Sequence, residues 1–420
     1  MELKRVVVTG LGALTPIGNT LPDYWESLKS GVSGAARITY FDPKHHKTQF
    51  ACELKGFDVN EFIHRKEARR MDKFSQYALV VTEEAIGDAR LTEGSFNPDR
   101  VGVIWGSGIG GLETFQDEAQ VLLKAREEDT GPKFNPFFIP KMIADIAPGN
   151  ISIKYGFRGP NYTTVSACAS SSHALIDAFT YLRLGKADVI VTGGSEAAVN
   201  ETGIGGFNAC HALSTNNDNP QTASRPFDST RDGFVLGEGA GAIILEEYEH
   251  AKARGANIYA EIVGGGMSAD AHHMTAPHPE GLGARNVMKY ALDDADLAID
   301  KVDYINVHGT STPLGDVAEL TAIQKVFGEK AYDLNISSTK SMTGHLLGAA
   351  GAIETIATIK AVHKNFIPPT INHSTPDENI DQKLNLTLNK GQAREVDVAM
   401  TNTFGFGGHN ASIVIKKFKE

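Results

Sequence analysis

Short runs of β-branched residues alternate with stretches of helical periodicity along the whole chain. Helical patterns such as Phe74–Ala89 and Ser171–Leu184 lie between the runs. The runs predict these strands: Arg5–Thr9, Val101–Ile104, Thr163–Ser166, Val189–Thr192, Ile258–Val263, Tyr304–Val307, Ile336–Ser338, Val398–Thr401 and Ser412–Lys416. Alternation of this kind is typical of an α/β protein in which helices cover buried sheets.

The two halves of the chain echo each other. A strand-and-glycine segment stands near the start of each half, at Val7–Gly12 and at Ile262–Met267. Each half later has a strand, a short turn and a helix of small residues. A length of 420 residues favours two domains of about 200 residues each. We therefore expect an internal duplication, with halves at residues 1–252 and 253–420 that meet in the charged stretch Glu247–Ala256.

Charge and cysteine content restrict the partners and the compartment. The formal net charge of -11 makes the chain a poor generic binder of nucleic acid or anionic membranes. Its three cysteines lack metal-ligand spacing and are too few for a disulfide framework, which fits a reducing compartment. The first apolar run, Val6–Val8, is too short for a signal peptide, and no run approaches the ~18 apolar residues of a membrane span. We expect a cytoplasmic protein without membrane insertion.

Cys168 is the candidate nucleophile. The segment from Tyr162 to His173 reads as a strand, a turn and a helix, with Cys168 at the N-terminal edge of the helix. The unpaired N–H groups and the positive dipole end of a helix favour the thiolate there. Small neighbours leave room for an acyl group. A buried, inert cysteine is the alternative for this segment alone, and it is the interpretation that we keep for Cys52 and Cys210.

Two histidines stand where a catalytic site would gather. His308 ends a predicted strand, and sites in α/β proteins form at such C-terminal strand ends. His345 precedes the small and apolar run Leu346–Ala352, which predicts a buried helix starting at this histidine. Burial and a helix N-terminus both favour a neutral imidazole, which can donate one hydrogen bond. Lys340 and Glu354 are expected to pair with each other or to orient the histidines, with a surface salt bridge as the alternative.

A structural role is the alternative for each histidine taken singly. Metal binding is disfavoured, because neither an HExxH motif nor suitably spaced carboxylates accompany them.

These segments together resemble the β-ketoacyl-acyl-carrier-protein (ACP) synthases, and the likeness covers essentially the whole chain. The matching segments are Gly106–Leu112, Cys168, Asp232–Gly239, His308–Pro313 (His-Gly-Thr-Ser-Thr-Pro), Lys340–Gly351 (Lys-Ser-Met-Thr-Gly-His-Leu-Leu-Gly-Ala-Ala-Gly) and Thr403–Asn410 (Thr-Phe-Gly-Phe-Gly-Gly-His-Asn). Synthase III would carry asparagine in place of His345, and thiolases use a late second cysteine that is absent after Cys210. The most similar branch is synthase II, the elongation enzyme.

The resemblance implies a thiolase-like fold of two βαβαβαββ halves in five αβαβα layers, and a homodimer. It implies a catalytic set of Cys168, His308, His345 and Lys340, supported by Glu354. The backbone N–H groups of Cys168 and Phe404 would form the oxyanion hole. The resemblance implies that Ile109, together with Phe138 of the partner subunit, lies beside the acyl chain. It implies that Thr310 and Thr312 hydrogen-bond the phosphopantetheine arm. It places Phe404, with the nearby Phe406, at a gate to the acyl tunnel.

ACP is the partner that the resemblance implies. Carrier proteins are acidic, as this chain is, so local cations must overcome their repulsion. Lys66, Arg69 and Arg70 match basic residues that the family uses for docking. A solvated helix face is the alternative for this run.

The expected reaction is fatty-acid elongation. Cys168 takes an acyl group from ACP, malonyl-ACP loses carbon dioxide to give an enolate stabilised by the histidines, and the enolate attacks the acyl group. Loss of carbon dioxide drives the step, so no metal or redox cofactor is expected. The alternatives are a ketosynthase of a specialised polyene or polyketide pathway, a noncatalytic carrier-binding subunit, and a dinucleotide-dependent oxidoreductase. For the last, Gly10-Leu11-Gly12 is an incomplete GxGxxG motif with Thr15 in place of the third glycine.

Overall fold

A computed structural model describes residues 3–419, and a ten-stranded mixed sheet forms its centre. In spatial order the strands are β10 (Asn335–Ser337), β9 (Tyr304–Asn306), β13 (Val398–Gly405), β14 (His409–Lys416), β8 (Ala260–Ala269), β1 (Val6–Leu14), β7 (Gly239–Glu247), β6 (Val189–Glu196), β4 (Val101–Gly106) and β5 (Asn161–Thr164). Short strands pair separately as β2 (Ala36–Arg37) with β3 (Phe50–Ala51), and as β11 (Phe366–Ile367) with β12 (Gln392–Ala393).

Helices connect the strands. They are α1 (Leu21–Ser30), α2 (Arg65–Ala68), α3 (Lys73–Ala89), α4 (Leu112–Glu127), α5 (Phe138–Met142), α6 (Ile146–Tyr155), α7 (Ser170–Arg183), α8 (Glu201–Ala209), α9 (Tyr248–Ala253), α10 (Leu282–Asp294), α11 (Pro313–Phe327), α12 (Lys340–Thr343) and α13 (Ala350–Lys364). Within residues 3–419, no helix is long and apolar enough to cross a membrane.

The sheet consists of two copies of one five-stranded unit. β1 and β8 meet over only three residue pairs, Val6–Val8 with Ala260–Ile262. Outward from this junction, the units run β1-β7-β6-β4-β5 and β8-β14-β13-β9-β10. When the five strands of each unit are numbered in chain order, their spatial order is 1-5-4-2-3 in both units. The parallel and antiparallel pairings of neighbouring strands match as well. The expected duplication is confirmed, while its boundary at residue 252, inside α9, stays a prediction.

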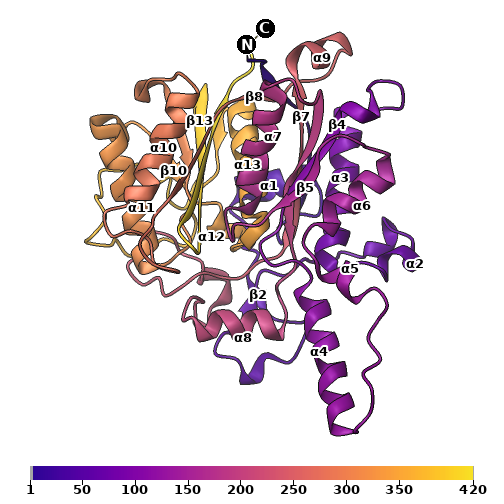
Figure 1. Cartoon of the computed structure of the whole chain (residues 1–420). Coiled ribbons are helices and arrows are strands. Elements are labelled where there is room, and N and C mark those ends of the chain that lie inside the picture. The colour runs from indigo at the N-terminus through magenta and orange to yellow at the C-terminus, as the bar shows by residue number, and fades with distance from the viewer. Residues whose placement is uncertain (1–2, 420) are drawn as a thin grey trace.

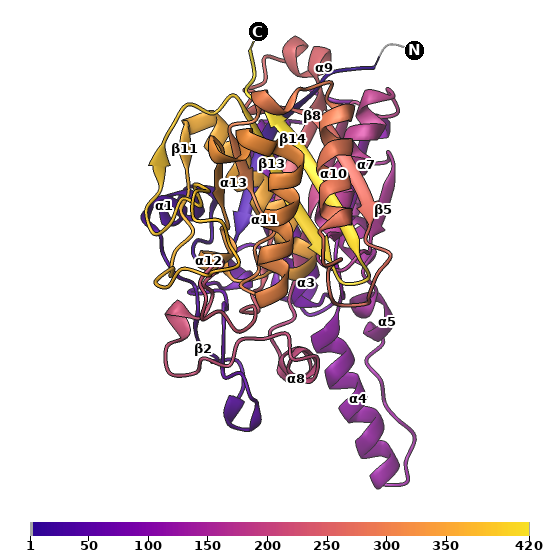
Figure 2. The same ribbon diagram turned by 90° about the vertical axis from the view of Figure 1, so that its left-hand side faces the viewer.

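The elements stack in five layers, as Figure 1 shows. α7 and α13 lie between the two units, α3 and α6 cover the outer face of the first, and α10 and α11 cover that of the second. In Figure 2, α10 and α11 lie in front of β13 and β14. Apolar clusters fill the layer interfaces, with Leu175 and Ile353 in the middle, Val81 and Ile151 on one side, and Val287 and Ile323 on the other. The expected αβαβα arrangement is confirmed.

Glycines in equivalent places of the two units let the outer helices approach the sheet. A Cβ on Gly10 or Gly12 of β1 would lie 2.3 or 2.1 Å from a carbonyl oxygen of α3, and one on Gly264 or Gly266 of β8 would lie 2.3 Å from one of α10. Gly10 and Gly12 thus sit inside a strand that pairs with β7, not at the strand-to-helix turn that cradles a dinucleotide. This placement contradicts the oxidoreductase alternative.

The loops and short helices that surround the site gather at one end of the layers, opposite both termini (Figure 1). All the predicted strands are present. The prediction missed β7 in the main sheet and the two-residue strands β2, β3, β11 and β12. The first four residues of β7, Gly239–Ala242, are small rather than β-branched, so the pattern that marks a strand is weak there.

Candidate active site

Cys168 lies in a tight turn between β5 and α7. Ala169 is the N-cap residue of α7, so Cys168 directly precedes the cap. Ala167 has φ +51°, a left-handed conformation that costs a residue with a Cβ about 1–2 kcal/mol. The Ser170 hydroxyl holds this turn, since it donates to the Ala167 carbonyl oxygen (2.6 Å) and accepts from the Ser166 N–H (3.0 Å). The thiol is therefore held in place at the start of α7.

The burial of this thiol bears on the predicted thiolate. Cys168 is only 8% exposed. Burial raises the pKa of its thiol to about 12, although the Lys340 ammonium and the Phe406 backbone N–H act in the opposite direction. Burial therefore opposes the predicted thiolate, because a charge is costly to bury, and the resting thiolate stays a prediction.

His308 and His345 lie close together. Their ring centroids are 5.3 Å apart and the rings are nearly perpendicular, at 87°. His308 follows β9, and its backbone N–H donates to the carboxylate of Glu319 (2.9 Å), as does that of Gly309 (2.9 Å). The backbone N–H of His345 donates to the Val235 carbonyl oxygen (2.7 Å). Backbone hydrogen bonds thus fix both histidines from behind.

Both imidazoles are neutral near pH 7. Burial lowers the pKa of each well below its ordinary value of 6.5, and the Lys340 ammonium lowers both further. The predicted helix at His345 is wrong, because this residue is followed by a short 3-10 turn (Leu347–Ala349) and α13 begins only at Ala350. Burial and a neighbouring cation, rather than a helix N-terminus, keep His345 neutral.

Lys340 and Glu354 form a buried ion pair. Their side chains are 2% and 1% exposed, and the Lys340 Nζ contacts the Glu354 Oε1. Burial raises the pKa of the Glu354 carboxyl to about 7, while the Lys340 ammonium lowers it. The expected pairing is confirmed and the surface alternative is excluded. Because Lys340 also lowers the pKa of both histidines, the pair belongs to the electrostatics of the site.

One cavity of about 310 Å³ joins these groups. Its lining includes Cys168, His308, His345, Thr310, Thr312, Phe404 and Phe406. Ile109 and Phe138 do not line it, and Ile109 is 41% exposed. Lys66, Arg69 and Arg70 are exposed on and after α2. The structure thus gathers the catalytic and arm-binding candidates, and leaves the acyl-pocket and docking candidates on the surface of the single chain.

The C-terminal loop brings Phe406, rather than Phe404, to the thiol. The Phe406 backbone N–H acts to lower the pKa of the Cys168 thiol, and a Cβ on Gly405 would lie only 3.1 Å from the Cys168 nitrogen. Phe404 still belongs to β13, and its ring centroid is 5.7 Å from that of His308. Phe406 is therefore a further candidate, beside Phe404, for the second N–H of the expected oxyanion hole.

Two buried carboxylates organise the loops, and sequence reasoning missed both. Glu319 holds His308 as described, and Glu196 accepts hydrogen bonds from the backbone N–H groups of Gly108 (2.8 Å), Ile109 (3.2 Å) and Gly348 (3.0 Å). Glu196 is a single acid in a run of small or apolar residues, and Glu319 shares such a run with Asp316. This signal could have found them. Among residues 3–419, no three His, Cys, Asp or Glu side chains are grouped so that they could hold a metal ion.

Comparisons with known proteins agree with this site. Two family profiles match the chain: "Beta-ketoacyl synthase, N-terminal domain" over residues 3–251 and "Beta-ketoacyl synthase, C-terminal domain" over residues 259–374. The chain is 50% identical over 420 residues to a Synechocystis protein named 3-oxoacyl-[acyl-carrier-protein] synthase 2, covering 100% of this chain and 99% of the relative. A Staphylococcus aureus protein of the same name is 49% identical over 417 residues, with 99% of each chain covered.

Solved structures give the same result. A β-ketoacyl synthase from Burkholderia phymatum superposes with a TM-score of 0.91 at 36% identity, covering 99% of this chain and 100% of that one. A ketosynthase solved with its type II polyketide acyl-carrier protein and a bound hexaketide superposes with a TM-score of 0.92 at 33% identity and the same coverage. With its duplicated five-layer fold and full-length likeness, this chain belongs to the β-ketoacyl synthase family of thiolase-like condensing enzymes.

Proposed function

We propose that the chain elongates fatty acids by condensing malonyl-ACP with an acyl group held on Cys168. The observation that carries this proposal is that Cys168, His308 and His345 line one cavity, with both of these histidines neutral. Identity of 50% to a 3-oxoacyl-ACP synthase 2, against 33% to the polyketide ketosynthase, favours fatty-acid elongation over a specialised pathway. Turnover of saturated acyl-ACPs with malonyl-ACP tests the proposal, and the specialised alternative predicts no turnover of them.

The first half-reaction is acyl transfer to Cys168. The sulfur attacks the thioester carbonyl carbon, and the thiol proton goes to the departing pantetheine sulfur. As negative charge develops on the carbonyl oxygen, the backbone N–H of Cys168 and that of Phe404 or Phe406 donate to it. Fixed donors aimed at a developing oxyanion are usually the largest single contribution to such a step.

The second half-reaction is decarboxylative condensation. His308 and His345 each donate a hydrogen bond to the thioester carbonyl oxygen of malonyl-ACP, so that loss of carbon dioxide leaves a stabilised enolate. Its carbon attacks the acyl carbonyl, a C–C bond forms and the bond to Cys168 breaks. The product is β-ketoacyl-ACP, and the thiol is restored once the sulfur takes up a proton. Neutral histidines suit this role, because imidazolium would repel the Lys340 ammonium.

We further propose that ACP docks on the basic residues around α2. Reversing the charge at Lys66 and Arg69 (Lys66→Glu, Arg69→Glu) should raise the KM for acyl-ACP about tenfold or more, because surface charges mainly set encounter with a charged partner. Turnover of a small acyl thioester mimic should not change. Lys186→Glu, an exposed lysine just after α7, is the matched control. An unchanged KM for acyl-ACP in the double variant would exclude this docking surface.

We also propose that two chains pair through the face that carries β5. This strand ends the sheet, and exposed sheet edges invite pairing. Beside it, Ile153 is 81% and Val165 is 63% exposed, and exposed large apolar side chains mark interaction surfaces. In such a homodimer, Phe138 of the partner subunit would close an acyl pocket over Ile109.

Ile109→Phe tests the acyl pocket. The larger ring should block long acyl chains and spare short ones, because packed interiors have little spare volume. We expect kcat/KM to fall by about 100-fold for C16 acyl-ACP and less than about threefold for C4, which is within the range of one overpacked contact. Ile299→Phe, at a residue that is 40% exposed in the second half, is the control. A uniform decrease from C4 to C16 would mean that Ile109 does not line the pocket.

A further inference from the structure

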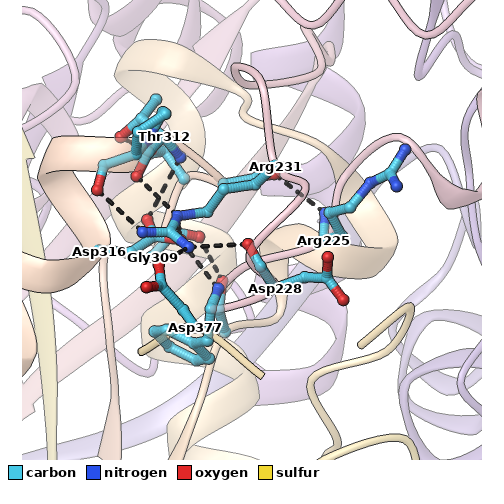
Figure 3. Close-up of polar contacts among 12 residues, drawn as sticks. Arg225, Asp228, Arg231, Gly309, Thr312, Asp316 and Asp377 are labelled. Atoms are coloured by element: carbon cyan, nitrogen blue, oxygen red, sulfur yellow. Dashed lines mark hydrogen bonds and ion pairs between the residues drawn. The ribbon is translucent and has the colours of Figure 1, made fainter. Parts of the chain in front are cut away.

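A buried charged cluster centred on Arg231 lies behind the cavity, and no step of the proposed reaction uses it. Arg231 is 5% exposed. Its Nη1 donates to the Asp377 Oδ2 (2.6 Å) and to the Asp228 carbonyl oxygen (2.7 Å). Its Nε lies 3.4 Å from the Asp316 Oδ2. Figure 3 shows the Arg231 guanidinium reaching into the middle of these groups, whereas the guanidinium of Arg225 points away.

The same guanidinium holds the loop that joins His308 to α11. Nε donates to the Thr312 carbonyl oxygen (3.1 Å), and Nη2 donates to that of Pro313 (2.8 Å). Asp316, which is fully buried, accepts from the Thr312 N–H (3.4 Å) and from the Phe227 N–H (3.0 Å). The loop is thus held through both its carbonyl groups and its N–H groups, on the side away from the cavity.

The loop needs this support because its backbone is strained. Ser311 has φ +66°, which a residue with a Cβ adopts only where the surroundings enforce it. The Ser311 carbonyl oxygen accepts from the Gly233 N–H (3.1 Å), and its hydroxyl accepts from the Arg225 N–H (3.0 Å). Both donors belong to the chain segment that carries Arg231.

Two hydroxyls stand on the cavity side of this strained loop. Thr310 and Thr312 flank Ser311 in the sequence, their Oγ1 atoms are 3.1 Å apart, and both residues line the cavity beside His308. Any shift of the loop backbone would move this pair of hydroxyls relative to the catalytic groups.

We infer that Arg231 is a positioning residue for the phosphopantetheine arm: it fixes the Thr310–Thr312 hydroxyl pair and so governs capture of the carrier arm rather than the chemical steps. This inference rests on the proposed function. A lysine could not replace the arginine, because the planar guanidinium reaches two carbonyl oxygens of the loop and a carboxylate at once, and an ammonium cannot match that fork.

Arg231→Lys tests the inference by separating KM from kcat. The KM for malonyl-ACP should rise about tenfold, the range of coupling within one hydrogen-bond network, while kcat changes less than twofold. The rate of Cys168 alkylation by iodoacetamide should not change, although a general loosening of the site would alter it. Arg100→Lys is the control, since Arg100 pairs with Asp188 (2.6 Å) and the Gly185 carbonyl oxygen (2.9 Å) before β4, away from the cavity.

A double-mutant cycle with Thr312→Val shows whether Arg231 acts through the hydroxyl pair. The combined variant should have a KM no higher than that of the worse single variant, whereas multiplied effects would overturn the inference. An unchanged KM in folded Arg231→Lys, or a parallel loss of kcat and of the rate of Cys168 alkylation, would overturn it too.

If Arg231→Lys does not fold, Asp377→Asn at the solvent side of the cluster replaces it as the test. We expect this variant to raise the KM for malonyl-ACP, and an unchanged KM would contradict the inference.

The outcome is distinguishable from failure of the proposed function. If the wild-type protein catalyses the condensation and Arg231→Lys leaves the KM for malonyl-ACP unchanged, only the role of Arg231 is overturned. If the wild type does not condense, saturation-transfer NMR of pantetheine 4′-phosphate still compares arm binding by the two proteins, with weaker binding expected for Arg231→Lys and equal binding contradicting the inference.

Discussion

The Cys168→Ala protein folds but takes no acyl group from acyl-ACP, because alanine has no atom that can form the thioester. We expect condensation to fall about 10⁶-fold, the size of loss that follows removal of a covalent nucleophile. Intact-mass measurement after incubation with acyl-ACP should show no added acyl group. Slow decarboxylation of malonyl-ACP should remain, since that half-reaction depends on His308 and His345.

Cys210→Ala is the matched control for this result. Cys210 is a second thiol that lines the same cavity, and it is exposed, so the expectation that this cysteine is buried is wrong. Its replacement should leave acylation intact. If the Cys168→Ala protein still gained the mass of an acyl group, and that group mapped to another residue, the nucleophile assignment would be wrong.

His308→Ala and His345→Ala should show the opposite pattern, in which acylation persists and decarboxylation is lost. Each variant removes one donor to the enolate oxygen, a loss of about 10²–10³ in rate. Lys340→Ala should act in the same direction, because it leaves the Glu354 carboxyl buried without its partner and changes the charge beside both imidazoles. Release of carbon dioxide from malonyl-ACP and the mass of the acyl-enzyme measure the two half-reactions separately.

His363→Ala is the control for the histidine variants. His363 lies in the last turn of α13, where its Nδ1 is 3.3 Å from the Tyr259 carbonyl oxygen, and it does not line the cavity. Equal losses of acylation and decarboxylation in His308→Ala, His345→Ala and Lys340→Ala would contradict the division of roles.

Most of the sheet could be predicted from the sequence because most of its strands are buried on both faces and therefore rich in β-branched residues. β7 escaped prediction because its small residues face α3 and α13, whose backbones come close, and that contact is set by packing rather than by local preference. The helix expected after His345 failed for a related reason. Small residues there reflect close packing, since a Cβ on Gly348 would lie 2.2 Å from the Gly108 nitrogen.

In the site, the sequence showed which residues come together but not their charge states. The helix end at Cys168 was visible in the pattern, whereas the depth of burial that raises the thiol pKa depends on the whole fold. Glu196 accepts from backbone N–H groups 88 and 152 residues away in the sequence, so no local motif marks its partners. Glu319 accepts from the loop just before its own helix, 11 residues away at His308. The candidacy of Phe406 beside Phe404 is likewise a matter of loop geometry, because a strand ends between them.

Condensation by the wild-type protein tests the central claim most directly. The purified protein is mixed with a saturated acyl-ACP and malonyl-ACP, and the ACP products are weighed by mass spectrometry while carbon dioxide is counted. We predict β-ketoacyl-ACP two carbons longer than the acyl group supplied, with one carbon dioxide released for each product formed. The contradicting result is a protein that carries an acyl group on Cys168 but forms no elongated acyl product and releases no carbon dioxide from malonyl-ACP. Such a protein is not an elongating synthase, and the account is then wrong.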